Sequence, residues 1–468
     1  LSDVIHYFKG QRASGTFDRA DRRARLFGTD QRRDVHGGWF DASGDMSKYL
    51  SHLSYANYLN PQQTPMVVWS LLKCRELLAT RRDIDGMNLC KRLNDEGLHG
   101  ADFLCRMQDE RGFFYMTLFD KWSKDPEQRE LCAYATQQGI KSARWQAGFR
   151  QGGGMAIAAL ARAAREPSGG DLDTSQYADA ASRGYLHLRE HNLAYLDDGV
   201  ENIIDDYCAL LAAVELTRTL GAEWLAEARD RAGRLCARQH AHPDLGHHWA
   251  ANDDGSRPYY HAAEAGLPVL ALLEYLAIEP DPARQWAART VAEQALAAEL
   301  ALAARAGNPF ALARQYVKGV DEAPRVSFFM PHHNESGYWW QGENARLASL
   351  ATMAFAAAQH LPGQSALLRT FGQQQLDWIL GRNPFNACML AGQGINNPEY
   401  TAGYPNAQGG ICNGITAGFD DENDVAFIPE AYKDRLDQNW RWGEQWIPHA
   451  AWFALAITWQ SAQGGHHD

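Results

Sequence analysis

The sequence predicts an all-α fold, a helical barrel of about twelve helices whose long loops converge on one rim. Helix-like apolar periodicity recurs from about residue 47 to residue 462, with almost no convincing strands. The connections between helix pairs are long, as in 109–147, 241–259, 308–341 and 383–445, and loops of this length usually carry function. No strict repeat of fixed length is visible, which disfavours a solenoid.

The chain divides into a polar beginning and a long helical remainder. Residues 1–34 are rich in arginine, and we expect a surface lead-in or the linker from a missing N-terminal module. A short helical element is expected near 47–58, and the next helix opens at Pro65, a residue permitted in a first turn. The other predicted helices cover 86–107, 152–165, 174–189, 200–219, 222–239, 260–277, 281–306, 342–360, 364–381 and 446–462. We therefore assign 35–468 to one helical domain.

Composition limits the classes of partner. Of the 468 residues, 45% are hydrophobic and 22% are charged, which suffices for a sizeable core. The formal net charge of -12 argues against a nucleic-acid partner. No apolar run approaches the roughly 18 residues of a membrane span, so we expect no membrane partner.

The eight cysteines are scattered, with no CxxC pair, and most stand in apolar helical settings. We expect reduced thiols in a cytoplasmic protein and no zinc bound by cysteine. The opening Leu1-Ser2-Asp3 lacks a basic and apolar leader, which fits the same expectation. We predict no cofactor and no metal.

The segment 36–49 contains two carboxylates, Asp41 and Asp45, four residues apart among glycines and aromatic residues. Glycines permit a tight, irregular backbone that can aim both side chains into one space. The plain alternative is an Asp/Gly turn whose acids cap the next helix. Lys48 either compensates the paired charges or is simply exposed.

A third acid, Glu444, stands near the other end of the chain between Trp442 and Trp446. Apolar surroundings favour a carboxyl group that stays protonated, whereas the start of a helix favours the ionised form. The alternative role is a helix-capping glutamate. Widely separated acids in aromatic settings suit sugar hydrolysis, in which one carboxyl group protonates the leaving oxygen and another activates water.

The densest polar and aromatic run covers 331–344. Trp and Tyr rings stack on sugar faces, while His, Asn and Glu bind hydroxyls or an amine. The adjacent histidines lack the i, i+4 spacing of a helical metal pair, so we favour substrate contact. The predicted binding residues of this run are His332, His333, Glu335, Trp339 and Trp340.

Further binding candidates lie in other loops. Tyr259 and His261 open a predicted helix, where His261 either faces the barrel mouth or is a satisfied core histidine. Trp145 precedes the run Gly152-Gly153-Gly154, which is no phosphate loop because the Lys-Ser/Thr of such loops is absent. Trp442 and Trp446 complete the predicted substrate-binding set.

Three separated motifs resemble glycoside hydrolase family nine. Residues 37–45, Gly-Gly-Trp-Phe-Asp-Ala-Ser-Gly-Asp, are similar to the family's Gly-Gly-Trp-Tyr-Asp-Ala-Gly-Asp. Residues 379–384, Ile-Leu-Gly-Arg-Asn-Pro, resemble its Ile-Leu-Gly-x-Asn-Pro helix end, and Gly443-Glu444 resembles its C-terminal Asn-Glu. The resemblance implies an inverting enzyme with an (α/α)6 barrel. It also implies that Asp45 is the general base, Asp41 holds the attacking water and Glu444 is the general acid.

Two departures refine the resemblance. Ser43 is an extra residue between the acids, and the family's usual His-His-Arg is missing from 385–412. The spacing of 41–45, with the segments 60–63 and 331–336, resembles the exo-β-D-glucosaminidase branch, which implies release of glucosamine from chitosan oligosaccharides. The rival functions are a β-glucosidase or endoglucanase acting on cello-oligosaccharides, and a sugar-binding pseudoenzyme.

Overall fold

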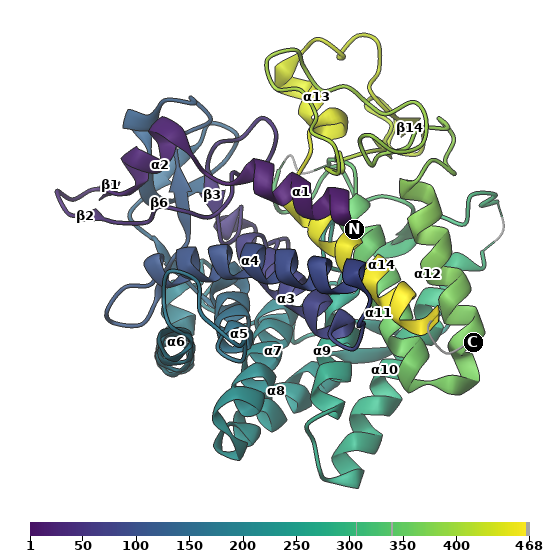
Figure 1. Ribbon diagram of the computed structural model, residues 1–468. Helices are drawn as coiled ribbons and strands as arrows, with labels where there is room; N and C mark the ends of the chain where they lie inside the picture. Colours follow the sequence, from purple (N-terminus) through teal and green to yellow (C-terminus); the bar gives the residue numbers. More distant parts are fainter. Residues whose placement is uncertain (306, 338–339, 465–468) are drawn as a thin grey trace. The chain divides into compact units, whose positions relative to one another are not determined.

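The structure, a computed structural model, describes residues 1–305, 307–337 and 340–464 (Figure 1). Helices dominate this part of the chain, and the predicted all-α class is confirmed. The fourteen α-helices found there are α1 (Ser2–Gln11), α2 (Gly15–Asp21), α3 (Thr64–Leu78), α4 (Ile84–Arg106), α5 (Gly154–Ala163), α6 (Thr174–Tyr195), α7 (Ile203–Leu220), α8 (Leu225–Ala237), α9 (Leu267–Leu276), α10 (Pro282–Ala303), α11 (Asn344–His360), α12 (Ser365–Ile379), α13 (Leu436–Gly443) and α14 (Ile447–Gly464).

The loops contain short strands that were not expected. They are β1 (Ala24–Leu26), β2 (Arg32–Arg33), β3 (Lys48–Tyr49), β4 (Phe114–Tyr115), β5 (Thr117–Phe119), β6 (Glu130–Ala135), β7 (Ile140–Ser142), β8 (Gln146–Ala147), β9 (Gln239–His242), β10 (Gly246–Trp249), β11 (Gln315–Val317), β12 (Arg325–Ser327), β13 (Thr416–Ala417) and β14 (Val425–Ala426). Strands of two to six residues are too short for alternating hydrophobicity to reveal them.

The chain forms two compact units, which we call the first unit (Phe8–Arg231) and the second unit (Leu1–Tyr7 with Ala232–Asp468). In the first unit, α3 packs on α4 and α5, and α5 packs on α6 and α7. Pro65 stands in the first turn of α3, and the Asp83 carboxylate caps α4 by accepting from the Gly86 N–H. Predicted helix starts of this kind agree with the structure to within a few residues.

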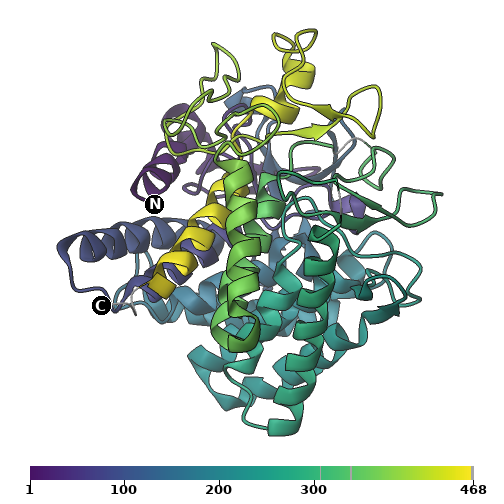
Figure 2. The same ribbon diagram turned by 90° about the vertical axis from the view of Figure 1, so that its right-hand side faces the viewer.

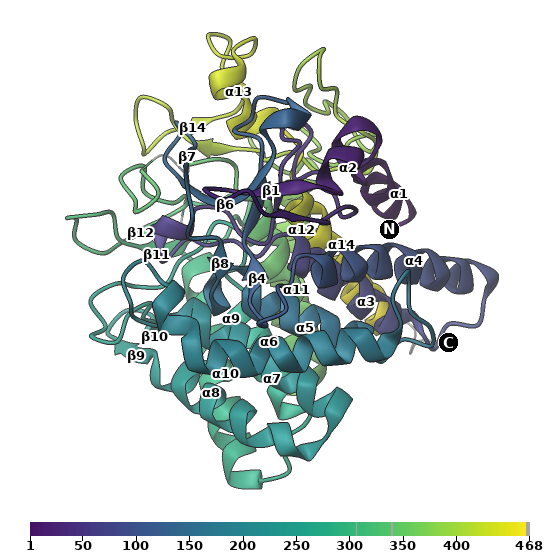
Figure 3. The same ribbon diagram turned by 90° about the vertical axis from the view of Figure 1, so that its left-hand side faces the viewer.

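A sheet in the first unit has the strand order β2-β1-β6-β5-β3, and β7 also pairs with β6. Figure 3 shows β1, β6 and β7 of this sheet. Strands β5 and β3 pair antiparallel, with Tyr49 opposite Thr117. The segment 47–58, predicted to be helical, therefore contains strand β3 and only a single 3-10 turn, Ser54–Ala56. The helical prediction was wrong here because the sheet register outweighs the local pattern.

The segment 1–34 is folded: it contains α1, α2, β1 and β2, and Tyr7 and Phe8 are buried. Asp21, at the end of α2, is fully buried and pairs with Arg129 at 2.6 Å and with the Nζ of Lys48 at 2.8 Å. The Lys48 ammonium also donates to the carbonyls of Val35 and Gly37. Lys48 is thus neither exposed nor the counter-charge of the Asp41 and Asp45 pair.

In the second unit, α11 is central and packs on α9, α12 and α14, while α9 also packs on α10. The long segment that joins α12 to α14 holds only α13, β13 and β14 as regular elements in the part described, and it gathers beyond the end of α12 (Figure 2). Among described residues, no helix combines the length and the apolar character required to cross a membrane. The eight cysteines are free thiols.

Candidate active site

The backbone before the acid pair is shaped by glycine. Gly37 and Gly38 have φ angles of 86° and 69°, in the left-handed region that side chains other than glycine rarely adopt. A Cβ atom on Gly38 would lie 2.7 Å from the Phe103 ring. Next to them Trp39 is fully buried, and its indole N–H donates to Glu96 at 2.8 Å. These contacts fix the backbone of residues 37–39, which lead into the turn of 41–45.

The turn itself closes on its own backbone. The N–H groups of Ala42 and Asp45 each donate to the carbonyl of the other, at 3.4 and 3.3 Å. The Asp41 N–H donates to the Ser47 carbonyl at 3.1 Å. Asp41 and Asp45 are 2% and 6% exposed, so both acids are buried. Neither acid caps a following helix, because β3 follows instead.

Asp45 accepts three hydrogen bonds. Its Oδ1 accepts from the Ser47 N–H at 2.8 Å, and its Oδ2 accepts from the Tyr49 hydroxyl at 2.7 Å and the Trp122 indole at 3.2 Å. A carboxylate has about four lone-pair positions, so one remains for a water molecule. That position is on Oδ1, and the three hydrogen bonds together fix the direction in which it points.

Asp41 has a different set of partners. Its Oδ2 lies 3.0 Å from the Nε2 of His52, and its Oδ1 accepts from the amide of Gln63. The Nδ1 of His52 in turn lies 2.5 Å from the Tyr134 hydroxyl. The imidazole also stacks on Tyr49, with ring centroids 3.6 Å apart. His52 therefore joins the surroundings of both acids.

The pKa of Asp45 is raised to about 6. Burial is the largest cause, and the negative charges of Asp41 and Asp120 add to it. The hydrogen bond from Tyr49 and the nearby His52 oppose the rise. Asp120 is fully buried and accepts from the Ser47 hydroxyl at 2.9 Å. A carboxyl group with this pKa accepts protons better than an exposed aspartate does.

Sequence reasoning missed the residues that hold the pair: Tyr49, His52, Gln63, Asp120, Trp122 and Tyr134. Tyr49 and His52 follow the motif directly, and their aromatic character was the available signal. Gln63 immediately precedes α3, and the other three come from the loop and strands after α4. No spacing in the sequence indicates that these four residues contact the motif.

The same group offers metal-ligand atoms. Asp41, Asp45 and His52 can each present one such atom, and these atoms lie within 4.8 Å of one another. Trp145, the remaining predicted site residue of the first unit, is half-buried, and its carbonyl accepts from the Met116 N–H. Its contacts do not join it to the pair.

In the second unit, His332 and Trp340 stack with centroids 4.1 Å apart. The Arg441 guanidinium lies 4.1 Å from the Trp340 ring, and Phe419 packs on that ring from 4.8 Å. These contacts bring the predicted residues His332 and Trp340 into one cluster. His333 is exposed, and Trp339 lies outside the described residues.

Glu335 pairs with Arg257 through both carboxylate oxygens, one of them at 3.0 Å. The negative charge of Glu335 is therefore shared with a cation.

Tyr259 and His261 have stacked rings with centroids 6.4 Å apart. His261 is fully buried, its Nδ1 accepts from the N–H groups of Ala263 and Glu264, and its Nε2 lies 4.0 Å from the Glu264 carboxylate. Since this turn ends only at Gly266, α9 begins later than the predicted residue 260.

Glu444 ends α13 in an extended conformation, and its carbonyl accepts from the Asn413 N–H at 2.8 Å. Its side chain is half-buried, immediately before α14. On either side of it, Trp442 is 0% and Trp446 5% exposed, and the Trp442 indole donates to the Thr416 hydroxyl. In the structure, these two predicted sugar-binding tryptophans are packed interior side chains.

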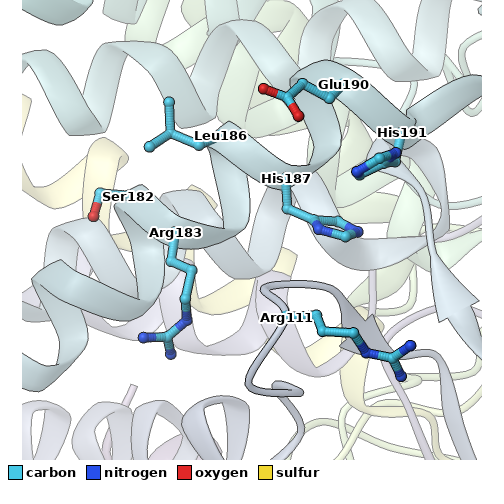
Figure 4. Close-up of a pocket in the computed structure, with 7 residues that line it drawn as sticks. All are labelled: Arg111, Ser182, Arg183, Leu186, His187, Glu190 and His191. Atoms are coloured by element: carbon cyan, nitrogen blue, oxygen red, sulfur yellow. The ribbon is translucent and has the colours of Figure 1, made fainter.

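A hollow of about 430 Å³ lies elsewhere in the first unit, along α6 (Figure 4). It is lined by Arg111, Ser182, Arg183, Leu186, His187, Glu190 and His191. Arg111 pairs with Asp109, Arg183 donates to Gln108, and His187 bonds to the Tyr195 hydroxyl. The hollow contains neither acid of the pair, and its residues Arg111, Arg183 and His187 already have partners.

Comparison with known proteins decides the family. The sequence matches the family described as Glycosyl hydrolase family 9 over residues 1–405. The chain belongs to this family. The match begins at residue 1 and so includes the segment expected as a lead-in. Among curated proteins, none matches the chain.

Solved structures of family 9 endoglucanases share the fold. A metagenome-derived family 9 endoglucanase has a TM-score of 0.63 at 18% identity, with 98% of this chain and 80% of that chain covered. Endoglucanase CelQ from Clostridium thermocellum, solved with cellotriose, has a TM-score of 0.59 at 14% identity, with 99% and 70% covered. The cellulase Cel9M of C. cellulolyticum has a TM-score of 0.58 at 14% identity, with 99% of both chains covered. The predicted (α/α)6 barrel fold is thereby confirmed.

Proposed function

We propose that this family 9 glycoside hydrolase is an inverting exo-glycosidase that releases terminal β-1,4-linked glucosamine from chitosan oligosaccharides. Asp45 acts as general base, Asp41 orients the attacking water and Glu444 protonates the leaving oxygen. The observation that carries the proposal is the contrast between the two buried carboxylates: Asp45 has one open acceptor position and a pKa raised to about 6, whereas Asp41 is tied to His52 and Gln63.

This contrast supports different roles for the two acids. A base with a pKa near neutrality accepts the proton of water as the water attacks. Its three hydrogen bonds keep the open lone pair of Asp45 in one direction, so the water is held where it is deprotonated. The second carboxylate, fixed by His52, accepts the other hydrogen of that water.

The preference for glucosamine is supported by charge. A protonated amine favours nearby carboxylates, and Asp41, Asp45 and Asp120 supply three in one buried group. Glu335, which we also predicted to contact the substrate, shares its charge with Arg257, so it contributes less to an amine site than its sequence position suggested. The departure in spacing at Ser43 supports the same branch of the family.

The alternative is action on cello-oligosaccharides as an endoglucanase or β-glucosidase, which is supported by the endoglucanases among the similar structures, one of them complexed with cellotriose. The purified chain is incubated with diglucosamine, its N-acetylated form and cellobiose, and the products are identified. We expect glucosamine from diglucosamine, formed first as the α-anomer in proton NMR. Faster turnover of cellobiose would support the alternative, and a first-formed β-anomer would contradict inversion.

The variant Glu444→Gln distinguishes an active glycosidase from a sugar-binding pseudoenzyme. We expect it to lose hydrolysis of diglucosamine while it still binds the substrate, because the amide cannot protonate the leaving oxygen. A binding protein without activity would show no hydrolysis in the unchanged chain.

We also propose a cytoplasmic location, supported by the eight free thiols. Recovery of the protein only outside the cell would contradict this location.

A further inference from the structure

The donor atoms of Asp41, Asp45 and His52 form the one compact group of its kind among the described residues. One atom from each side chain lies within 4.8 Å of the other two, and both carboxylates are buried. Ligand atoms at such separations can meet around one ion after small rotations of the side chains. The group thus has the size of a three-ligand metal site.

The chemistry of the donors selects the ion. One imidazole and two carboxylates suit a borderline divalent ion such as Zn²⁺ or Co²⁺, whereas Mg²⁺ and Ca²⁺ prefer oxygen ligands alone. Two ionised carboxylates carry the charge that a divalent cation neutralises. Three protein ligands would leave a fourth position for water.

Hydrogen bonds from neighbouring residues orient the candidate ligands His52 and Asp45. The Nδ1 of His52 lies 2.5 Å from the Tyr134 hydroxyl and its Nε2 lies 3.0 Å from Asp41. The tautomer with its proton on Nδ1, directed at Tyr134, frees the Nε2 lone pair for a metal ion, whereas without metal an Nε2–H donates to Asp41. Metal-bound histidines are usually fixed in this way by a partner on the other ring nitrogen. Tyr49 and Trp122 likewise donate hydrogen bonds to the Oδ2 of Asp45 and so fix the orientation of that carboxylate.

We propose that Asp41, Asp45 and His52 bind one Zn²⁺ ion, and that this ion inhibits the enzyme. The inhibition rests on the proposed function: a bound ion occupies both carboxylates that would orient and deprotonate the attacking water. The binding itself rests only on the geometry of the three side chains. Zn²⁺ is therefore an inhibitor of this site and takes no part in the hydrolytic step.

The direct test is crystallographic. Crystals of the full chain are soaked with ZnCl₂, and the anomalous difference map is calculated at the zinc edge. We expect a peak between Asp41, Asp45 and His52. A fully soaked crystal with zinc peaks only at other histidines, such as His187 and His191 of α6, would overturn the proposal.

Solution binding is measured by titration of the full chain with Co²⁺ and Zn²⁺, followed by cobalt absorption and calorimetry. His52→Gln, whose amide can still donate to Asp41 but is a poor ligand, should lose the tightest site. Tyr134→Phe should weaken it by about tenfold, since it removes only the partner of the ligand. His187→Gln with His191→Gln is the matched control and should leave the tightest site unchanged.

The outcomes separate the two proposals. Hydrolysis of diglucosamine that Zn²⁺ does not inhibit would contradict the inference and leave the proposed function standing. A zinc peak at the three residues of a chain that hydrolyses none of the substrates would support the binding site and contradict the proposed function. Equal zinc affinity of the unchanged chain and a folded His52→Gln variant would contradict the site.

Discussion

The hydroxyl of Tyr49 donates to Oδ2 of Asp45 at 2.7 Å, from a ring on which His52 stacks. This bond opposes the rise in the pKa of Asp45. Tyr49→Phe keeps the ring and removes the donor. We expect the acidic limb of the rate profile to move to higher pH and kcat to fall, because the ionised carboxylate loses a partner. An unchanged limb in Tyr49→Phe would show that the bond does not control this carboxyl group.

The activity of the metal-free enzyme should fall as the pH drops through about 6. The pKa of Asp45 is raised, so the base is ionised above that pH and protonated below it, where it can no longer accept a proton from water. The rate on diglucosamine is measured from acid to neutral pH with a chelator present. An acidic limb near pH 4, the ordinary range of aspartate, would contradict the assignment of Asp45 as base.

The two acids should respond differently to amidation. Asp45→Asn removes the base, and we expect a loss of kcat of about a thousandfold, in the range found for proton-transfer groups. Asp41→Asn keeps a polar group for the water and should lose less. Single-turnover rates on diglucosamine check both variants, and circular dichroism checks their folding. A larger loss of kcat in Asp41→Asn than in Asp45→Asn would indicate that Asp41 is the general base and Asp45 orients the water.

Gly38→Ala should destabilise the first unit. The φ angle of 69° costs an alanine roughly 1–2 kcal/mol, and its Cβ would also press on the Phe103 ring. We expect a lower melting temperature and a reduced rate, since the turn of 41–45 follows directly. Gly10→Ala is the control, because no atom lies within 4 Å of its Cβ and it sits in α1. That variant should be neutral or slightly more stable.

His449 should make the second unit sensitive to acid. It is fully buried, and burial lowers its pKa to about 3. Between pH 6.5 and that value the unfolded chain binds a proton that the folded chain does not, so stability falls as the pH falls. The loss between pH 6.5 and 5 is about 2 kcal/mol. Urea unfolding at both pH values checks this, and His449→Gln, which still can donate to Asn413, should reduce the difference.

Much of the helical frame could be predicted because long helices repeat their apolar pattern many times. The starts of α3, α4 and α10 also carry proline or aspartate where a first turn favours them. The pair Asp41 and Asp45 could be singled out because the glycines lie beside it in the sequence. The helix α13 and the two-residue strands were missed, since eight residues or fewer show too little periodicity.

The surroundings of the pair could not be predicted because they depend on distant parts of the chain. His52 meets Tyr134 across 82 positions, and Trp122 meets Asp45 across 77. The sequence likewise did not reveal that Arg257 takes up Glu335, or that Trp442 donates to Thr416 inside the second unit. Aromatic residues beside acids looked alike in the sequence, whether they line a site or fill the interior.

The buried charges of Lys48, Asp21 and Arg129 bear on where the catalytic module can be cut. Lys48 lies three residues after Asp45, yet its counter-ion comes from α2, far upstream of the motif. A shortened protein that started at residue 35 would leave an ammonium group in the interior with no anion beside it, opposite the lone guanidinium of Arg129. The smallest working version of this hydrolase must therefore begin ahead of Asp21.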